Sequence, residues 1–315
     1  MTAQTRNDWV VIGVPTSAGA HHAGQDLAPA ALRAAGLVGR LQAAGLAVTD
    51  AGDLAGGLFA VDHEHPHARN LRTVVRVTRE VADAVALHLA AGRRPLVVGG
   101  DCTVTLGVIA GFRRRHPDVG LAYVDGDADL GAALSEESSG ILDSTGIAHL
   151  LGLGEPDLAA LAGQPPLLDA SRLAIVGCDP REVTEVGRAF LAERGVSYTE
   201  GPDLAADPEG VARTALAALA GGPGGRPAAG ALTGSGGPLV VHFDVDVVDS
   251  GDLPLGNYPH YNSGVRLQDV SACLRVLLAD PSCAALVLTE VNPTYDPDGS
   301  TLDRYLAALT TALAG

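Results

Sequence analysis

An apolar run that turns acidic at its end occupies Leu239–Asp249 and reads LVVHFDVDVVD. Two further stretches have the same pattern: Pro95–Cys102 reads PLVVGGDC, and Gly120–Asp129 reads GLAYVDGDAD. Short runs of this kind alternate along the chain with longer helical segments rich in Ala and Leu, which predicts an α/β fold. In such a fold a parallel sheet is covered by helices on both faces.

The hydrophobic periodicity places each predicted element. Strands are predicted over residues 9–14, 47–51, 95–98, 120–125, 173–176, 239–246 and 284–290, and helices over 28–44, 69–91 and 302–314. No clear linker divides the chain, so residues 1–315 are expected to form one domain. Residues 221–238, which are rich in Gly, Pro and Ala, are expected to form a flexible insertion.

Acidic residues cluster where the predicted strands end. Asp125, Asp244, Asp246 and Glu290 all fall at such ends, and a parallel sheet binds its ligands beyond the carboxyl ends of its strands. The spacing also puts His242, Asp244 and Asp246 on one face of a strand. Carboxylates at this density repel one another unless cations hold them, so the pattern predicts a cluster of divalent metal ions.

The composition argues against several classes of protein. All 21 basic residues are arginine, so a phosphate-binding loop with its Lys and Schiff-base chemistry are both excluded. A net charge of −16 argues against a nucleic-acid partner and suits small cations and metal ions. No stretch resembles a signal peptide or a membrane span, and the four Cys are not closely spaced. We therefore expect a cytoplasmic protein with no membrane association and with reduced thiols.

Three ordered motifs resemble those of the arginase/agmatinase (ureohydrolase) family. Gly99–Thr103, GGDCT, resembles the Gly-Gly-Asp-His-Ser motif of that family, and Val124–Asp129, VDGDAD, resembles its Asp-Ala-His-x-Asp motif. Phe243–Asp249 resembles its Asp-x-Asp-x-x-Asp motif. Weaker similarity occurs at Ile12–Pro15, Ala28–Arg33, Ser139–Gly140 and Glu290–Pro293. The resemblance covers nearly the whole chain.

The resemblance implies a three-layer α/β/α fold around two Mn²⁺ ions, whose bridging hydroxide attacks a guanidinium carbon. Carried over by position, the metal ligands would be Cys102, Asp125, Asp127, Asp129, Asp244 and Asp246. Glu290 would match the carboxylate that holds the substrate guanidinium. Asp179 resembles a residue that contacts the substrate α-amino group. Asp249 would orient the metal ligands without binding the metal itself.

The chain departs from the family pattern at four positions. Cys102 and Asp127 stand where the family has histidine ligands, Asp143 stands where arginases carry a catalytic His, and Ile141 replaces a substrate-binding Asn. Four Asp and two neutral His give a ligand charge of −4, whereas five Asp and one thiolate give −6. Either Asp127 is protonated or not a ligand, or the substrate adds positive charge, or the second metal binds poorly. A Cys ligand also favours Zn²⁺ or Co²⁺.

A Cys at this position, with the catalytic His missing, resembles the arginase-like hydroxyarginine hydrolase of D-cycloserine biosynthesis. The expected reaction is therefore hydrolysis of a guanidino C–N bond, with Nω-hydroxy-L-arginine as the first candidate substrate and other small cationic guanidino compounds next. Asp143 is a candidate proton donor if burial raises its pKa. Two alternatives stay open: a catalytically silent, metal-free binding protein, and a single-metal amide hydrolase. The sequence does not determine the oligomeric state.

Several histidines have two interpretations. His242 is either a metal-site residue or a satisfied core histidine. His21 and His22, which follow the first predicted strand, are candidates for the mouth of a pocket.

Overall fold

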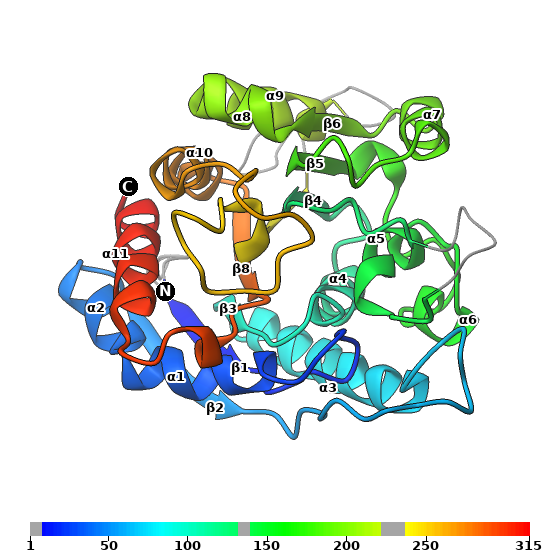
Figure 1. The fold of residues 1–315 in the computed structure, drawn as a ribbon, viewed down its shortest axis with the longest axis horizontal. Coiled ribbons are helices and arrows are strands. Elements are labelled where there is room, and N and C mark those ends of the chain that lie inside the picture. Colours follow the sequence, from blue (N-terminus) through cyan, green and yellow to red (C-terminus); the bar gives the residue numbers. More distant parts are fainter. Residues whose placement is uncertain (1–7, 132–138, 222–236) are drawn as a thin grey trace.

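The computed structural model describes residues 8–131, 139–221 and 237–315. Within them, eight parallel strands form one sheet in the order β2-β1-β3-β8-β7-β4-β5-β6 (Figure 1). The strands are β1 (Trp9–Gly13), β2 (Val48–Asp53), β3 (Arg94–Val98), β4 (Gly120–Val124), β5 (Leu173–Cys178), β6 (Ser197–Glu200), β7 (Leu239–Asp244) and β8 (Cys283–Thr289). This arrangement confirms the predicted α/β fold with a central parallel sheet.

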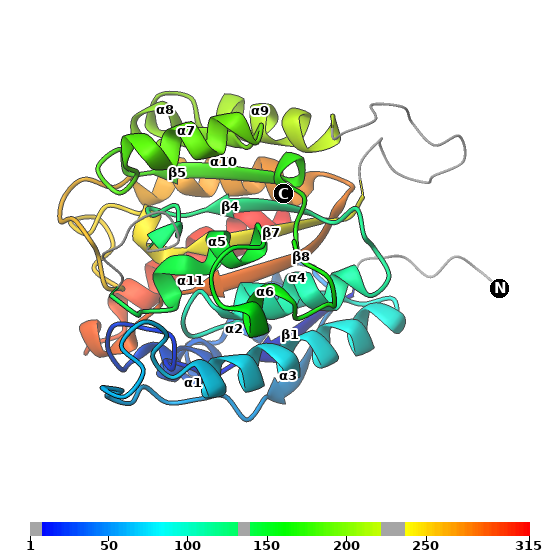
Figure 2. The same ribbon diagram turned by 90° about the vertical axis from the view of Figure 1, so that its right-hand side faces the viewer.

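Helices cover both faces of the sheet, so the molecule has three layers (Figure 1). Figure 2 looks onto the layer that contains α3, α5, α6 and α7. One layer consists of α1 (Ala28–Ala34), α2 (Leu37–Ala43), α8 (Gly201–Ala206), α9 (Pro208–Ala220), α10 (Leu267–Ala279) and α11 (Ser300–Ala314). The opposite layer consists of α3 (Leu71–Ala90), α4 (Val104–Arg113), α5 (Gly146–Leu150), α6 (Pro156–Ala159) and α7 (Glu185–Glu193). The predicted three-layer α/β/α architecture is confirmed.

Alternate residues of the strands build two separate cores. In β7, Val241 and Phe243 pack in the core that contains α9, α10 and α11, whereas Val240 packs in the core that contains α3 and α4. This alternation follows from the two-residue repeat of a strand. His242 and Asp244 therefore share the face of Val240, toward α4.

The structure corrects three details of the predicted elements. The helix predicted over 28–44 is two helices, because Gly36 adopts a left-handed conformation with φ of 88°. The strand predicted over 239–246 ends at Asp244, whose side chain accepts the backbone N–H of Asp246 and starts a 3₁₀ turn at Val245–Val247. Strand β6 was not predicted, because its four residues are half-buried and mostly polar.

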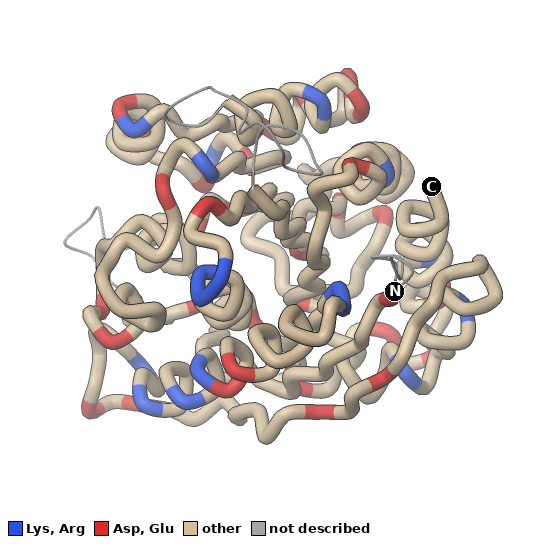
Figure 3. The backbone as a smooth tube through the Cα atoms, turned by 180° about the vertical axis from the view of Figure 1, so that it is seen from behind, with Lys and Arg blue, Asp and Glu red and all other residues tan. Residues whose placement is uncertain are grey.

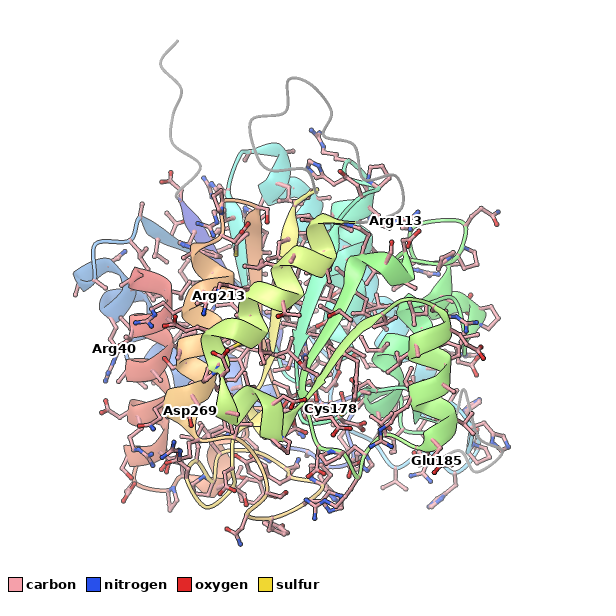
Figure 4. All side chains as sticks on the ribbon, turned by 90° about the horizontal axis from the view of Figure 1, so that it is seen from above. Arg40, Arg113, Cys178, Glu185, Arg213 and Asp269 are labelled. Atoms are coloured by element: carbon pink, nitrogen blue, oxygen red, sulfur yellow. The ribbon has the colours of Figure 1, made fainter. Side chains whose placement is uncertain are left out.

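The loops that follow the strands gather at one end of the sheet. Cys178, the last residue of β5, lies toward that end in the view onto α7, α8 and α9 (Figure 4). Acidic positions are scattered over both helical layers (Figure 3). No helix in the described part of the chain is both long and apolar enough to cross a membrane. The insertion predicted at 221–238 lies, except for residues 221, 237 and 238, outside the described residues.

Candidate metal centre and active site

A cavity of about 540 Å³ opens at the carboxyl ends of the central strands. Eight carboxylate residues line it: Asp125, Asp127, Asp129, Asp143, Glu182, Asp244, Asp246 and Glu290. Cys102 lines it as well, and so do His21 and His22. No arginine is among the described residues that line the cavity. The structure therefore brings together all six predicted metal ligands, Asp143 and Glu290.

The ends of four adjacent strands position these side chains. Asp125 follows β4, Asp244 ends β7, Glu290 follows β8, and Cys102 lies in the short loop between β3 and α4. That loop passes very close to the loop after β1: a Cβ on Gly100 would lie 1.5 Å from the backbone oxygen of Thr16. Only glycine fits there, which explains why a glycine precedes the acidic turn.

The thiol of Cys102 is surrounded by metal-binding atoms. Its Sγ donates a hydrogen bond to Oδ2 of Asp244 at 2.6 Å and lies 4.0 Å from Oδ2 of Asp125. Burial and then repulsion from the neighbouring carboxylates raise the pKa of this thiol well above its ordinary value. Without a metal ion, the sulfur therefore keeps its proton and shares it with Asp244.

His242 lies beneath the cavity and is fully buried. Its ring stacks on Tyr123, with the ring centroids 3.9 Å apart. Nδ1 lies 2.8 Å from the hydroxyl of Thr105, and Nε2 lies 3.3 Å from Oδ2 of Asp125. Burial lowers the pKa of His242 to about 3. The ring is therefore neutral at physiological pH, which is the form that binds metals.

Two groups of potential ligand atoms occur among the described residues. Within each group, one atom from every residue lies within 4.8 Å of the others. The first group contains Cys102, Asp125, His242 and Asp244, and the second contains Cys102, Asp143 and Glu290. Every member is buried. The structure thus favours His242 as part of the metal centre, which the sequence left open.

Asp127, Asp129 and Asp246 line the cavity but belong to neither group. Oδ1 of Asp127 accepts two backbone N–H groups of its own loop, at 2.6 and 3.3 Å. Asp129 accepts the hydroxyl of Tyr123, and Oδ1 of Asp246 accepts the N–H of Gly126 at 2.9 Å. A ligand role for these three residues stays a prediction, and the loop backbone already holds Asp127.

Burial is the largest cause of a raised pKa throughout the cavity, and repulsion between carboxylates adds to it. The pKa rises to about 6 for Asp244, to about 7 for Asp127 and to about 8 for Asp143. The pKa rises well above the ordinary value for Asp125, Asp129, Asp246 and Glu290. Such a site needs positive charge, from a metal ion or from a substrate, before all of its carboxyls ionise.

Glu290 is held in an unusual conformation. Its backbone has φ of 60°, a region that residues other than glycine rarely adopt. Nε2 of Gln25 donates to Oε2 of Glu290 at 2.9 Å, whereas Oε1 is buried and has no hydrogen-bond partner. Asp143 lies beside it and accepts the backbone N–H of Cys102 at 2.7 Å. Glu290 therefore keeps one oxygen free for a cation in the cavity.

Asp179 lies outside this cavity. It lines a separate cavity of about 200 Å³, where its carboxylate pairs with Arg181 at 2.5 Å and accepts the hydroxyl of Ser263. The hydrogen bond from Arg181 lowers the pKa of Asp179 to about 2. Glu182, three residues later, lines the central cavity and pairs with His260 at 2.6 Å. The structure therefore brings Glu182, and not Asp179, to the site.

Besides Tyr123, three residues that touch the site groups were not predicted from the sequence. Gln25 holds Glu290, and Thr105 contacts His242. The hydroxyl of Thr289 lies 3.3 Å from both Sγ of Cys102 and Nε2 of His242. Thr289 was detectable in principle, because it precedes Glu290 at a strand end. Gln25 and Thr105 belong to no acidic motif, and no sequence signal marked them.

The residues present fit divalent metal ions. A thiol, an imidazole and carboxylates are the donors that bind zinc and related ions. The unpartnered Oε1 of Glu290 adds a buried acceptor to the same cavity. The described lining offers no arginine to neutralise these groups.

Comparison with known proteins identifies the relatives of this chain. The arginase of Brevibacillus brevis is 29% identical over 97% of this chain and 97% of its own length. The arginase of Bacillus caldovelox is 26% identical over 97% and 96%, respectively. Among solved structures, the arginase from Bacillus cereus matches with a TM-score of 0.80 at 24% identity, covering 98% of this chain and 99% of that one.

A second solved structure, the proclavaminate amidino hydrolase from Streptomyces clavuligerus, matches with a TM-score of 0.69 at 18% identity. That match covers 98% of this chain and 92% of the other. At these identities, the two structures support the fold alone. A sequence profile of the arginase family, in contrast, matches residues 7–314. Since this match spans nearly the whole sequence, the chain belongs to the arginase family.

Proposed function

We propose that this chain is a metal-dependent hydrolase of a guanidino C–N bond. The observation that carries the proposal is the cavity, which eight carboxylate residues line and where four of them belong to buried groups of metal-binding donors. Its family places it among the hydrolases that act on linear amidines. Nω-hydroxy-L-arginine is the first candidate substrate, followed by a guanidino acid or an agmatine-like amine.

The metal centre would be built from the six cavity residues at the strand ends: Cys102, Asp125, Asp127, Asp129, Asp244 and Asp246. Divalent ions bound there would supply a water of lowered pKa as the nucleophile and a positive charge next to the substrate. Two Mn²⁺ ions are the first candidates, and Zn²⁺ or Co²⁺ suits the thiol of Cys102 better. The cofactor and the number of ions are both part of the proposal.

The remaining side chains would bind the substrate and move a proton. The free Oε1 of Glu290 is placed to accept a hydrogen bond from a guanidinium N–H, and Gln25 fixes the other carboxylate oxygen. Asp143 lies within 4.8 Å of Glu290, measured between ligand atoms, and would give its carboxyl proton to the leaving nitrogen. Glu182 faces the cavity and Asp179 lies outside it, so Glu182 would take the contact with the substrate α-amino group that was expected of Asp179.

The acidic lining also supports a small cationic partner for the cavity. We further propose a cytoplasmic location, which the four free and buried cysteines support.

The test is release of urea or hydroxyurea from Nω-hydroxy-L-arginine, arginine, agmatine and 4-guanidinobutyrate, each with Mn²⁺, Zn²⁺ or Co²⁺. We expect turnover of at least one substrate. We also expect Asp125→Asn to lower kcat/KM by about 100-fold or more, because the metal loses a charged ligand.

The matched control is Asp83→Asn, which removes an exposed carboxylate that pairs with Arg114 on the surface. It should leave kcat/KM unchanged. The proposal is wrong if no guanidino compound is hydrolysed with any of the three ions. Retained turnover in Asp125→Asn would show that any activity arises at another site.

A further inference from the structure

We propose that His242 is a metal ligand, and that Cys102, Asp125, His242 and Asp244 form one four-coordinate site selective for Zn²⁺ or Co²⁺ over Mn²⁺. The inference deepens the proposed function and rests on it, because it assigns the ligands of the same metal centre. The proposed site gains the imidazole of His242, which lies in β7. It does not include Asp127.

Three of the distances between the four donors lie near those of a tetrahedral site. Around zinc with bonds of about 2.0–2.3 Å, neighbouring donor atoms are separated by roughly 3.3–3.6 Å. Nε2 of His242 lies 3.7 Å from Sγ of Cys102 and 3.3 Å from Oδ2 of Asp125. Oδ2 of Asp125 lies 4.0 Å from the same sulfur. Three of the contacts therefore already lie near the separations that a bound ion requires.

The fourth contact is shorter for a chemical reason. Sγ of Cys102 and Oδ2 of Asp244 are 2.6 Å apart, since the thiol proton lies between them. A metal ion bound to the thiolate replaces that proton. The two atoms then become ligands of one cation, and they separate by about 1 Å to reach the tetrahedral spacing.

The surroundings of His242 resemble those of a ligating imidazole. A metal-bound histidine usually donates its second ring N–H to a fixed acceptor. Nδ1 of His242 lies 2.8 Å from the hydroxyl of Thr105, and Tyr123 stacks on the ring. These contacts fix the ring plane and direct Nε2 toward Cys102 and Asp125.

The charges of this donor set suit a single ion. One thiolate and two carboxylates with a neutral imidazole carry −3, compared with −6 for the six residues first considered. Asp127 is not needed, because backbone N–H groups already hold its Oδ1. The unpartnered Oε1 of Glu290 is a second, independent sign that the cavity holds a cation, since it is buried and only 7% of the residue is exposed.

The competing role for His242 is a purely structural one. In that role Nε2 carries the proton and donates it to Asp125 or Thr289, each 3.3 Å away. A structural imidazole leaves the metal with one thiolate and with carboxylate ligands alone. The two roles therefore predict different ligand spectra, whether or not the protein is active.

The experiment uses the full-length protein loaded with Co²⁺ or Zn²⁺. We expect a near-ultraviolet thiolate-to-cobalt charge-transfer band together with intense visible bands of tetrahedral cobalt. Cys102→Ser should abolish the charge-transfer band. His242→Asn should weaken Co²⁺ binding by about 100-fold or more in competition with a chromogenic chelator, and Thr105→Val by about 10–100-fold.

The matched control is His149→Asn. His149 is also buried, but it contacts the backbone of Thr145 before α5 and of Glu155 after it. The spectrum and affinity of this variant should equal those of the wild type. If His242→Asn fails to fold, X-ray absorption of the zinc-loaded wild type still decides the question. It should show one sulfur at about 2.3 Å and one imidazole at about 2.0 Å.

Wild-type cobalt affinity and an unchanged spectrum in His242→Asn would overturn the inference. Absorption data with only oxygen ligands, or tighter binding of Mn²⁺ than of Zn²⁺, would do the same. The expected spectrum without hydrolysis of any guanidino compound would contradict the proposed reaction but not this metal site. Hydrolysis with an oxygen-ligated octahedral cobalt spectrum would contradict the metal site but not the reaction.

Discussion

At the residue scale, Glu290 combines a strained backbone with an unpaired carboxylate oxygen. A residue other than glycine at φ of 60° costs about 1–2 kcal/mol, and the unpartnered Oε1 adds a further penalty. Hydrogen bonding to Gln25 fixes the side chain in this position. Strain of this kind is typical of functional sites, where binding and stability make opposite demands.

The substitution Glu290→Gln should change substrate binding and stability in opposite directions. Gln keeps the shape of the side chain and its contact with Gln25 but removes a buried acid that repels Asp143 and Asp244. We expect the free energy of unfolding of the metal-free protein to rise by about 1 kcal/mol or more. The KM of a cationic substrate should rise by about 10–100-fold, because a charged hydrogen bond is lost.

Thermal unfolding and steady-state kinetics measure the two effects. Glu80→Gln on the exposed side of α3 is the control, since it removes a carboxylate that pairs only with Arg76. A variant at residue 290 that loses stability and keeps its KM would contradict the role given to Glu290.

At the residue scale, the sequence predicted which residues form the site but not how their side chains point. Strand ends predicted which residues would gather, because all parallel strands end at one edge. The directions of the side chains could not be predicted. The carboxylate of Asp127 accepts N–H groups of its own loop, and Nε2 of His242 lies 3.7 Å from Sγ of Cys102, which lies in the loop after β3. Such contacts depend on loop shapes that no single motif encodes.

At the element scale, apolar runs identified seven of the described strands, because buried parallel strands are nearly continuous in Val, Ile and Leu. They missed β6, whose sequence SYTE has no such run. They also missed the break between α1 and α2, since a lone Gly36 inside an Ala-rich segment is a weak signal. Both of these errors fall on an edge or a break, where tertiary contacts outweigh local preference. No range was predicted for α4, α7, α9 or α10.

The loop between β3 and α4 yields a prediction at this scale. Gly100→Ala should destabilise the protein by about 1–3 kcal/mol, because the new Cβ would overlap the backbone oxygen of Thr16. The loop must then shift and carry Cys102 away from Asp244, so cobalt affinity should fall as well.

Gly39→Ala is the matched control within the same fold. Gly39 lies inside α2, and a Cβ there meets nothing within 4 Å. This change should stabilise the protein by about 0.5–1 kcal/mol and leave cobalt binding unchanged. Thermal unfolding and the cobalt titration measure both variants. Equal effects of the two substitutions would show that the close approach of the loops does not position Cys102.

At the scale of the whole molecule, the acidic cavity makes stability depend on pH and on metal. The pKa of Asp143 is raised to about 8, and the pKa values of Asp125, Asp129 and Asp246 are raised well above the ordinary value. Around neutral pH the folded metal-free protein therefore binds more protons than the unfolded chain. Its free energy of unfolding must fall as the pH rises.

The informative window is pH 7 to 8.5. Above about pH 7 the histidines of the unfolded chain are mostly neutral, so the lowered pKa values of the folded-state histidines contribute little. Each extra proton held by the folded state then lowers the free energy of unfolding by about 1.4 kcal/mol per pH unit.

Bound Zn²⁺ or Co²⁺ displaces these protons, so the free energy of unfolding of the metal-loaded protein should stay constant or rise from pH 7 to 8.5. Calorimetric unfolding with chelator and with metal measures both slopes, and Asp143→Asn should flatten the metal-free slope. A metal-free protein that becomes more stable from pH 7 to 8.5 would mean that the cavity carboxyls are ionised without a cation, against the burial and crowding that the structure shows.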